Sequence, residues 1–199
     1  MYMRIGIDID DTAFITVDSM IKYADKFDQE ELSGKGICGN LGLIRNRYYL
    51  SALYGWDEET KMRFFKKYYR NVLEESKPMP GAIETIQKLK RDGHEIYFIT
   101  ARLNIIEDVR KITVQAFQKY DIPYDQLIIN ASDKKIHCLE NHIDVFIEDS
   151  FETCQELSQE GIKTYLMTTK MNQNIEDAKV ERVYNWEEVY QKISARKES

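Results

Sequence analysis

Two acidic segments stand where the sequence predicts that buried strands end. Residues 8–12 (DIDDT) follow a short apolar run that begins near residue 3, and Glu148-Asp149 follow a second such run. Alternation along an extended chain places Asp8 and Asp10 on the same side of the backbone. Two carboxylates so close together are costly without a cation. Mg²⁺ is a suitable one, because it takes oxygen ligands and leaves positions for water and a phosphate.

An acidic cluster that only forms a turn or caps a helix is the alternative interpretation, and it requires no metal. For Asp8 and Asp10 taken alone, this alternative competes closely with the metal site. The second acidic pair, Glu148-Asp149, favours the metal because it supplies the missing acidic ligand at another strand end.

The elements that must position these acids alternate between short apolar runs and stretches with helical periodicity. The predicted strands are 3–8, 94–99, 127–129, 143–147, 163–167 and a short one at 183–184. The predicted helices are 81–91, 105–120, 134–141, 151–160 and 186–196. This alternation predicts an α/β fold, Rossmann-like, with a parallel sheet covered by helices on both faces. The carboxyl ends of such strands form the ligand crevice, so we expect Asp8 and Asp149 to meet although they are 141 residues apart (149 − 8).

A longer segment, residues 13–79, interrupts this rhythm and shows no convincing buried strand. Its helical patterns lie near 15–27, 45–54 and 57–75, and Asp57 is a candidate N-cap for the last. We therefore predict two domains, an α/β core formed by residues 1–12 and 80–199 and a helical cap inserted at residues 13–79. Aromatic residues are frequent in the cap, and we expect most of them to pack its interior and a minority to face a ligand.

Composition narrows the class of protein. The chain has 199 residues, with 28 basic and 34 acidic side chains and a net charge of −6, which disfavours a protein that coats a nucleic acid polymer. Small anionic substrates remain compatible with this charge. Three cysteines lie far apart without a CxxC pair, as expected of reduced thiols. The chain opens on a predicted strand, and no apolar stretch approaches the roughly 18 residues of a membrane span, so we predict a cytoplasmic protein that does not bind membranes.

Four motifs, taken in order, resemble those of the haloacid dehalogenase (HAD) superfamily of phosphatases. Residues 8–12 match its first motif, a strand followed by DxDx[TV], and Thr100 matches the Ser or Thr that ends a later strand. A lysine at a helix start matches the third motif, with Lys134 favoured and Lys135 as the fallback. The pair at 148–149 matches the acidic fourth motif. The ordered set spans roughly residues 3–167.

Within the superfamily, the chain is most similar to the 5′(3′)-deoxyribonucleotidase family and its bacterial relatives. The similarity lies in residues 78–82 (PMPGA), in the run Ser132-Asp133-Lys134, and in the helical insertion directly after the first motif. It implies a Mg²⁺-dependent phosphomonoester hydrolase, a 5′-nucleotidase that dephosphorylates (deoxy)nucleoside monophosphates. A phosphatase of a sugar phosphate or another small metabolite is the first alternative, and a catalytically silent binding module is the second. The oligomeric state stays open, with a homodimer among the alternatives.

The resemblance also implies a role for each matching residue. Asp8 would be the nucleophile that becomes an aspartyl-phosphate, and Asp10 the acid and base that serves the leaving group and the water. Mg²⁺ would be held by Asp8, the Asp10 carbonyl and Asp149, with Glu148 acting through water. Phosphate oxygens would be bound by two further side chains, Thr100 and Lys134.

Three positions depart from the family pattern or stay ambiguous. Asp11 occupies a place often held by Gly, and Asp tolerates the left-handed backbone that such a turn needs. Glu148 replaces a frequent Asp, which leaves Asp149 as the firmer metal ligand. Arg102 has two interpretations, a surface salt bridge or a substrate contact.

The cap is expected to cover the mouth of the site and to supply specificity contacts. Its aromatic residues could stack on a nucleobase. The cap residues that we select as the first candidates for substrate contact are Phe14, Arg45, Arg47 and Trp56.

Overall fold

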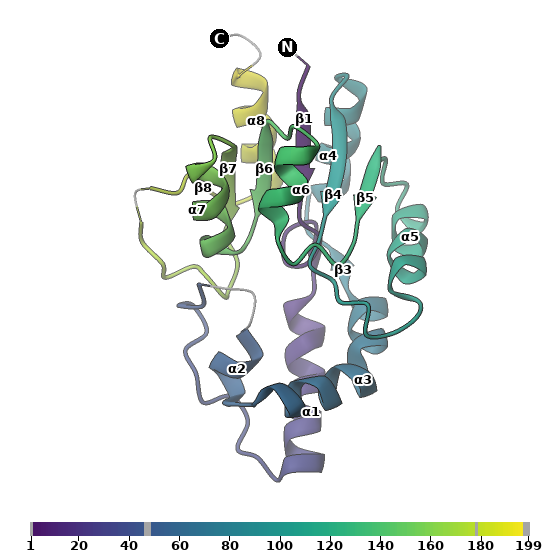
Figure 1. Ribbon diagram of the computed structural model, residues 1–199, viewed down its shortest axis with the longest axis vertical. Coiled ribbons are helices and arrows are strands. Elements are labelled where there is room, and N and C mark those ends of the chain that lie inside the picture. The colour runs from purple at the N-terminus through teal and green to yellow at the C-terminus, as the bar shows by residue number, and fades with distance from the viewer. Residues whose placement is uncertain (1, 46–48, 178, 197–199) are drawn as a thin grey trace.

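A six-stranded sheet, parallel throughout, forms the centre of the computed structural model, which describes residues 2–45, 49–177 and 179–196 (Figure 1). Its strands are β1 (Arg4–Ile7), β4 (Glu95–Ile99), β5 (Gln126–Ile128), β6 (Val145–Glu148), β7 (Lys163–Met167) and β8 (Arg182–Val183). Their order is β5-β4-β1-β6-β7-β8, and every adjacent pair is parallel. The chain runs outward from β1 to β5 and then crosses to the other side of β1. Such a reversal opens a crevice at the carboxyl ends of the central strands.

Five helices cover the two faces of this sheet. They are α4 (Ala82–Arg91), α5 (Val109–Lys119), α6 (Lys134–Glu140), α7 (Phe151–Gln159) and α8 (Trp186–Ala195). Alternating strand residues serve the two faces: Phe98 packs with α4, α5 and α8, whereas its neighbours Tyr97 and Ile99 pack with α6 and α7. The predicted α/β class is therefore confirmed.

Most predicted boundaries agree with the structure to within a few residues. The strand expected at 163–167 has those bounds as β7, and Gly161 adopts a φ of 81° just after the end of α7, the left-handed conformation of a C′ glycine. The helix α5 begins at Val109, four residues later than expected, because turns occupy the preceding residues. None of the helices within the described part of the chain is long and apolar enough to cross a membrane.

The segment between β1 and β4 holds three further helices, α1 (Val17–Leu32), α2 (Tyr49–Tyr54) and α3 (Glu58–Glu75). Asp57 caps α3 as predicted, since its carboxylate accepts from the Thr60 backbone N–H at 2.8 Å. The three helices share an apolar cluster, which includes Phe27, Trp56 and Phe64 and also takes in Met171 from the loop after β7. Figure 1 shows them beyond the carboxyl ends of the sheet strands.

A two-stranded ribbon joins this helical segment to the sheet. It consists of β2 (Phe14–Ile15) and β3 (Lys77–Pro78), which pair antiparallel. The chain thus leaves and re-enters the α/β part at adjacent points. The sequence does not reveal these strands, because two residues are too few to show alternation.

Gly6 allows β1 and β6 to pack closely below the crevice. A Cβ atom at this position would lie 2.3 Å from Phe146 Cδ2 and 3.1 Å from a methyl carbon of Ile143. Any larger residue would therefore displace the buried Phe146 ring, which lies on the strand that leads to Glu148 and Asp149.

We expect Gly6→Ala to lower the free energy of unfolding by about 2 kcal/mol, the usual cost of overpacking a buried site. Urea denaturation measures this change. The double variant Gly6→Ala/Phe146→Leu serves as the control, because the smaller leucine side chain leaves room for the added methyl group. A double variant that is destabilised by the full sum of both single changes would contradict this account.

Candidate functional site

Tight turns after β1 orient the three aspartates of residues 8–12. The backbone N–H groups of Ala13 and Phe14 both donate to the Ile9 carbonyl, at 3.1 and 2.8 Å. Asp11 adopts a φ of 57°, so the left-handed turn expected at this departure from the family pattern is present. Its carboxylate accepts from the two backbone N–H groups at the start of α1, those of Thr16 and Val17. Asp11 therefore caps the start of α1, whereas helix capping was the alternative interpretation for Asp8 and Asp10.

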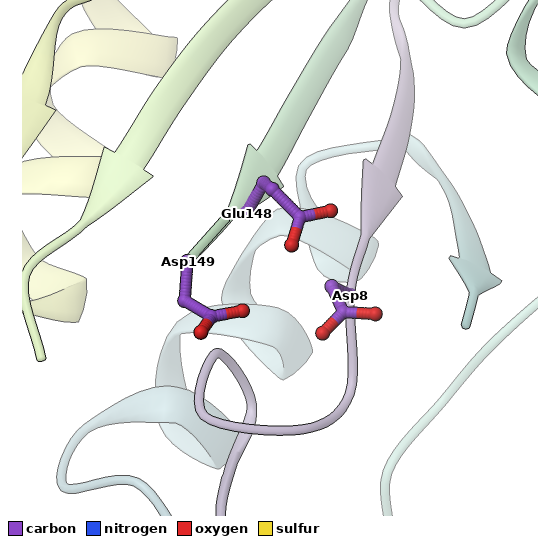
Figure 2. A group of neighbouring side chains, drawn as sticks. All are labelled: Asp8, Glu148 and Asp149. Carbon is purple, nitrogen blue, oxygen red and sulfur yellow. The ribbon is translucent and has the colours of Figure 1, made fainter. Parts of the chain in front are cut away.

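Asp8 lies in a different environment, next to the acidic pair at the end of β6. Its backbone N–H donates to the Ile147 carbonyl at 3.0 Å, which ties the two strand ends together. Asp8, Glu148 and Asp149 point toward one another (Figure 2). One carboxylate oxygen of each lies within 4.8 Å of one oxygen of each of the other two. Asp8 and Asp149 therefore lie close together at the edge of the sheet, as expected.

One buried cation serves two of these carboxylates. Lys134, the first residue of α6, donates its ammonium protons to Asp8 Oδ1 at 2.5 Å and to Glu148 Oε2 at 2.7 Å. Glu148 Oε1 also accepts from the Ser150 backbone N–H at 3.1 Å, so both oxygens of this residue have partners. The fallback residue, Lys135, lies on the surface 3.6 Å from a glutamate of the following helix. Of the two lysines, the structure places only Lys134 beside Asp8.

The balance of charge in this cluster is negative. Burial raises the pKa of Asp8 to about 7, and the charge of Lys134 opposes this rise while that of Glu148 adds to it. Burial and the charge of Glu148 also raise the pKa of Asp149 well above its ordinary value. Three carboxylates facing a single ammonium form a hard, oxygen-only donor set, and this set fits a divalent cation such as Mg²⁺.

Asp10 has a cation of its own. The Arg102 guanidinium donates from Nε to Oδ2 at 2.9 Å and from Nη2 to Oδ1 at 2.8 Å, and the Thr16 hydroxyl donates to Oδ1 at 2.7 Å. Desolvation raises the pKa of Asp10, but the charge and hydrogen bonds of Arg102, together with Thr16, lower it more. The net shift is therefore downward, opposite to that of Asp8.

The position of Arg102 excludes one of the two predicted roles, the surface salt bridge. Arg102 is only 4% exposed, so the surface salt bridge is wrong. The ion pair itself exists, between the buried Arg102 and the partly exposed Asp10. Thr100, at the end of β4, is 1% exposed, and its hydroxyl accepts from the Arg102 backbone N–H at 3.3 Å. The turn after β4 therefore folds back over the carboxyl edge of the sheet, which the sequence does not reveal.

These groups line one cavity whose opposite wall comes from the helices α1 to α3. The side chains that α3 contributes are Glu58, Lys61, Met62, Phe65 and Tyr69. Their spacing of three or four residues marks one face of a helix. The sequence does not single them out, because the same spacing also describes a helix face that packs in an apolar core.

The cap residues selected from the sequence lie elsewhere. Phe14 is buried in the main core against Phe117, and Trp56 is buried in the cap, where its indole N–H donates to Asp28 at 2.9 Å. Arg45 is exposed and lies over the ring of Phe151. These three do not line the cavity as far as the described residues define it. The fourth candidate, Arg47, lies outside the described residues.

Comparison with known proteins agrees with this geometry. The family described as "5′ nucleotidase, deoxy (pyrimidine), cytosolic type C protein" matches residues 3–198. A nucleotidase of Clostridium acetobutylicum is 32% identical over 145 residues, which make up 72% of this chain and 73% of that protein. The resemblance drawn from the four motifs is thereby confirmed.

Solved structures share the fold at low sequence identity. A predicted phosphoglycolate phosphatase of Haemophilus somnus has a TM-score of 0.70 at 16% identity and covers 97% of this chain and 98% of its own. A haloacid dehalogenase-like hydrolase of Streptococcus pneumoniae has a TM-score of 0.68 at 13% identity, with 96% and 98% covered. The architecture is therefore that of the HAD hydrolases.

We expect Lys134→Met to destabilise the metal-free protein strongly at pH 8 and weakly at pH 5. Burial holds the pKa of Asp8 in the folded protein above its unfolded value, so ionising Asp8 opposes folding increasingly as the pH rises toward 7. At pH values above the Asp8 pKa, removing Lys134 leaves a buried carboxylate unpaired and should lower the free energy of unfolding by about 3 kcal/mol. At lower pH, Asp8 takes up a proton and the loss becomes small.

Urea denaturation at both pH values, with a chelator present, measures the difference. Lys135→Met is the matched control, because its side chain is exposed and should change stability by less than about 0.5 kcal/mol. Equal effects of the two substitutions would show that Lys134 does not neutralise the cluster.

Proposed function

The chain belongs to the family of cytosolic type C deoxy-5′-nucleotidases, which are phosphoric monoester hydrolases, and from this premise we propose that it hydrolyses (deoxy)nucleoside monophosphates through an aspartyl-phosphate on Asp8, with Mg²⁺ as cofactor. The observation that carries the proposal is the meeting of Asp8, Glu148, Asp149 and Lys134 at one edge of the sheet. A nucleophile, a cation and spare acidic ligands are there within reach of one phosphate.

The metal would be held by carboxylate oxygens of Asp8 and Asp149, with the Asp10 carbonyl as a third ligand. Glu148 already has partners on both oxygens, which supports an indirect role for it. When bound, Mg²⁺ neutralises the repulsion between an anionic nucleophile and an anionic phosphate. The surplus of buried negative charge supports this assignment.

The reaction divides into two displacements. In the first, an Asp8 oxygen forms a bond to phosphorus, the bond from phosphorus to the ester oxygen breaks, and Asp10 gives that oxygen its proton. The negative charge of the bound phosphate opposes the lowering of the Asp10 pKa by Arg102, so that Asp10 enters this step protonated. In the second, a water oxygen bonds to phosphorus while Asp10 takes up the water proton and the Asp8–phosphorus bond breaks. Free phosphate leaves, and both aspartates return to their starting forms.

Two side chains are placed to bind the phosphate during both steps. The Lys134 ammonium already lies 2.5 Å from the nucleophile, so the phosphate oxygens would arrive beside its charge. Thr100 lines the same cavity at the end of β4. Fixed donors of this kind stabilise the charge that shifts among the phosphate oxygens during transfer.

The helical segment at residues 13–79 would act as the cap, and residues 1–12 and 80–199 as the catalytic core. The apolar cluster that its three helices share supports this division. The face that it turns to the cavity is mostly apolar, and Tyr49, Phe65 and Tyr69 are its aromatic side chains. Such a wall suits a flat nucleobase, which gains from stacking and from the exclusion of water.

A cytoplasmic location forms part of the same proposal. Cys38, Cys138 and Cys154 are all free thiols, as is usual in a reducing compartment.

We expect Asp8→Asn to abolish phosphate release while leaving the fold intact, because an amide cannot form the phosphoenzyme. A panel of deoxynucleoside monophosphates and sugar phosphates, assayed with the native protein, tests the substrate class at the same time. Turnover of sugar phosphates but not of nucleotides would overturn the nucleotidase proposal. Near-normal activity of Asp8→Asn would instead overturn the covalent mechanism.

We expect Mg²⁺ to raise the thermal unfolding temperature of the native protein and to do so less for Asp149→Asn. Binding to the folded state alone adds about 2.7 kcal/mol at a concentration 100 times the dissociation constant. The matched control is Glu152→Gln, an exposed acid on the following helix, which should respond as the native protein does. An unchanged Mg²⁺ titration of Asp149→Asn would move the ligand role to Glu148.

A further inference from the structure

The Arg102–Asp10 pair differs from a surface ion pair because its arginine is buried and has a further hydrogen-bond partner. The Arg102 side chain is 3% exposed, and its third nitrogen, Nη1, donates to the Thr113 hydroxyl on α5 at 2.8 Å. Thr113 in turn donates to the Val109 carbonyl at 2.8 Å, which orients its oxygen as an acceptor toward Arg102. The guanidinium is therefore fixed at both ends, by α5 on one side and by Asp10 on the other.

The contacts on Asp10 are unequal between its two oxygens. Oδ1 accepts from Arg102 Nη2 at 2.8 Å, from the Thr16 hydroxyl at 2.7 Å and, more weakly, from Arg102 Nε at 3.2 Å. Oδ2 accepts from Nε at 2.9 Å as its one contact among the described residues. The carboxylate is thus held in one orientation, with Oδ2 keeping more of its capacity for a further partner.

We propose that Arg102 is a positioning residue that acts through Asp10, holding the carboxylate so that Oδ2 faces the ester oxygen of the substrate. This inference rests on the proposed function, in which Asp10 protonates the leaving group. Three of the five N–H groups of Arg102 donate to Asp10 and Thr113, so these two partners set the orientation of the guanidinium.

The planar fork of arginine is what this role needs. A guanidinium fixes both the position and the rotation of a carboxylate, whereas a lysine supplies one point charge. Proton transfer depends on this orientation, because donor and acceptor must lie within hydrogen-bond reach in the transition state.

A comparison of two leaving groups isolates the effect. A nucleoside monophosphate leaves as an alkoxide that needs the Asp10 proton, whereas p-nitrophenyl phosphate leaves as a stabilised phenolate that does not. The quantity to measure is the ratio of kcat/KM for the nucleotide to kcat/KM for the aryl ester, since kcat/KM reports the first irreversible step. A loss of fold or of phosphate binding lowers both values and leaves this ratio unchanged.

We expect Asp10→Asn to lower the ratio by about 100-fold or more, within the usual contribution of general acid catalysis. Arg102→Met should lower it by about 10-fold, and Arg102→Lys by a smaller factor. The variant Asp10→Asn/Arg102→Met should show the same ratio as Asp10→Asn alone, because Arg102 has no leaving-group effect without its partner.

Two further variants keep the test decisive. Thr113→Val removes only the anchor of Nη1 and should lower the ratio about threefold, which gives an answer even where Arg102→Met does not fold. Arg110→Met is the matched control, because Arg110 lies on the same helix, is exposed, and donates to the Leu127 carbonyl away from Asp10. It should leave the ratio unchanged.

The outcomes separate this inference from the proposed function. If Asp10→Asn lowers both kcat/KM values equally, Asp10 is not the leaving-group acid and the proposed mechanism fails. If Asp10→Asn lowers the ratio while the Arg102 and Thr113 variants do not, the mechanism stands and the positioning role is overturned. An increase in KM for both substrates with Arg102→Met and an unchanged ratio would assign Arg102 to phosphate binding instead.

Discussion

Concentrated negative charge at the carboxyl edge of a buried sheet is the constraint on which this structure depends. Five carboxylates gather there, namely Asp8, Asp10, Asp11, Glu148 and Asp149. Each one in isolation would cost several kcal/mol to bury in ionised form. The fold meets this cost with three different partners: an ammonium, a guanidinium, and the backbone N–H groups that open α1.

The way in which these partners are shared shows where a further cation fits. Arg102 serves Asp10 alone, and the pKa of Asp10 falls. Lys134 is divided between Asp8 and Glu148, and the pKa of Asp8 stays raised at about 7. The pKa values of two aspartates that are only two residues apart are thus shifted in opposite directions. Positive charge is deficient on the Asp8 side, which is also the side where three carboxylates lie close enough to share one ion.

The parallel sheet brings these carboxylates together at little cost in conformational entropy. Parallel strands end at one edge, so residues at the ends of β1 and β6 become neighbours without any long loop to order. The hydrogen bond from the Asp8 N–H to the Ile147 carbonyl ties the two strand ends together, and the Phe146 ring packs against Gly6 behind them. Apolar clusters on both faces of the sheet pack behind these strand ends and stabilise them.

The sequence predicts the contacts that strand ends determine, and it fails where a choice between two faces of a helix is needed. The pairing of Asp8 with Asp149 is predictable from apolar runs that end in acid, and the choice of Lys134 from its motif. On α3, however, Phe64 and Tyr68 pack in the cap, while the residues next to them, Phe65 and Tyr69, line the cavity. Both stripes are aromatic and have the same spacing, so periodicity cannot distinguish them. Only the direction in which α3 crosses the crevice decides which stripe meets a substrate, and that direction is set by packing between segments far apart in the chain.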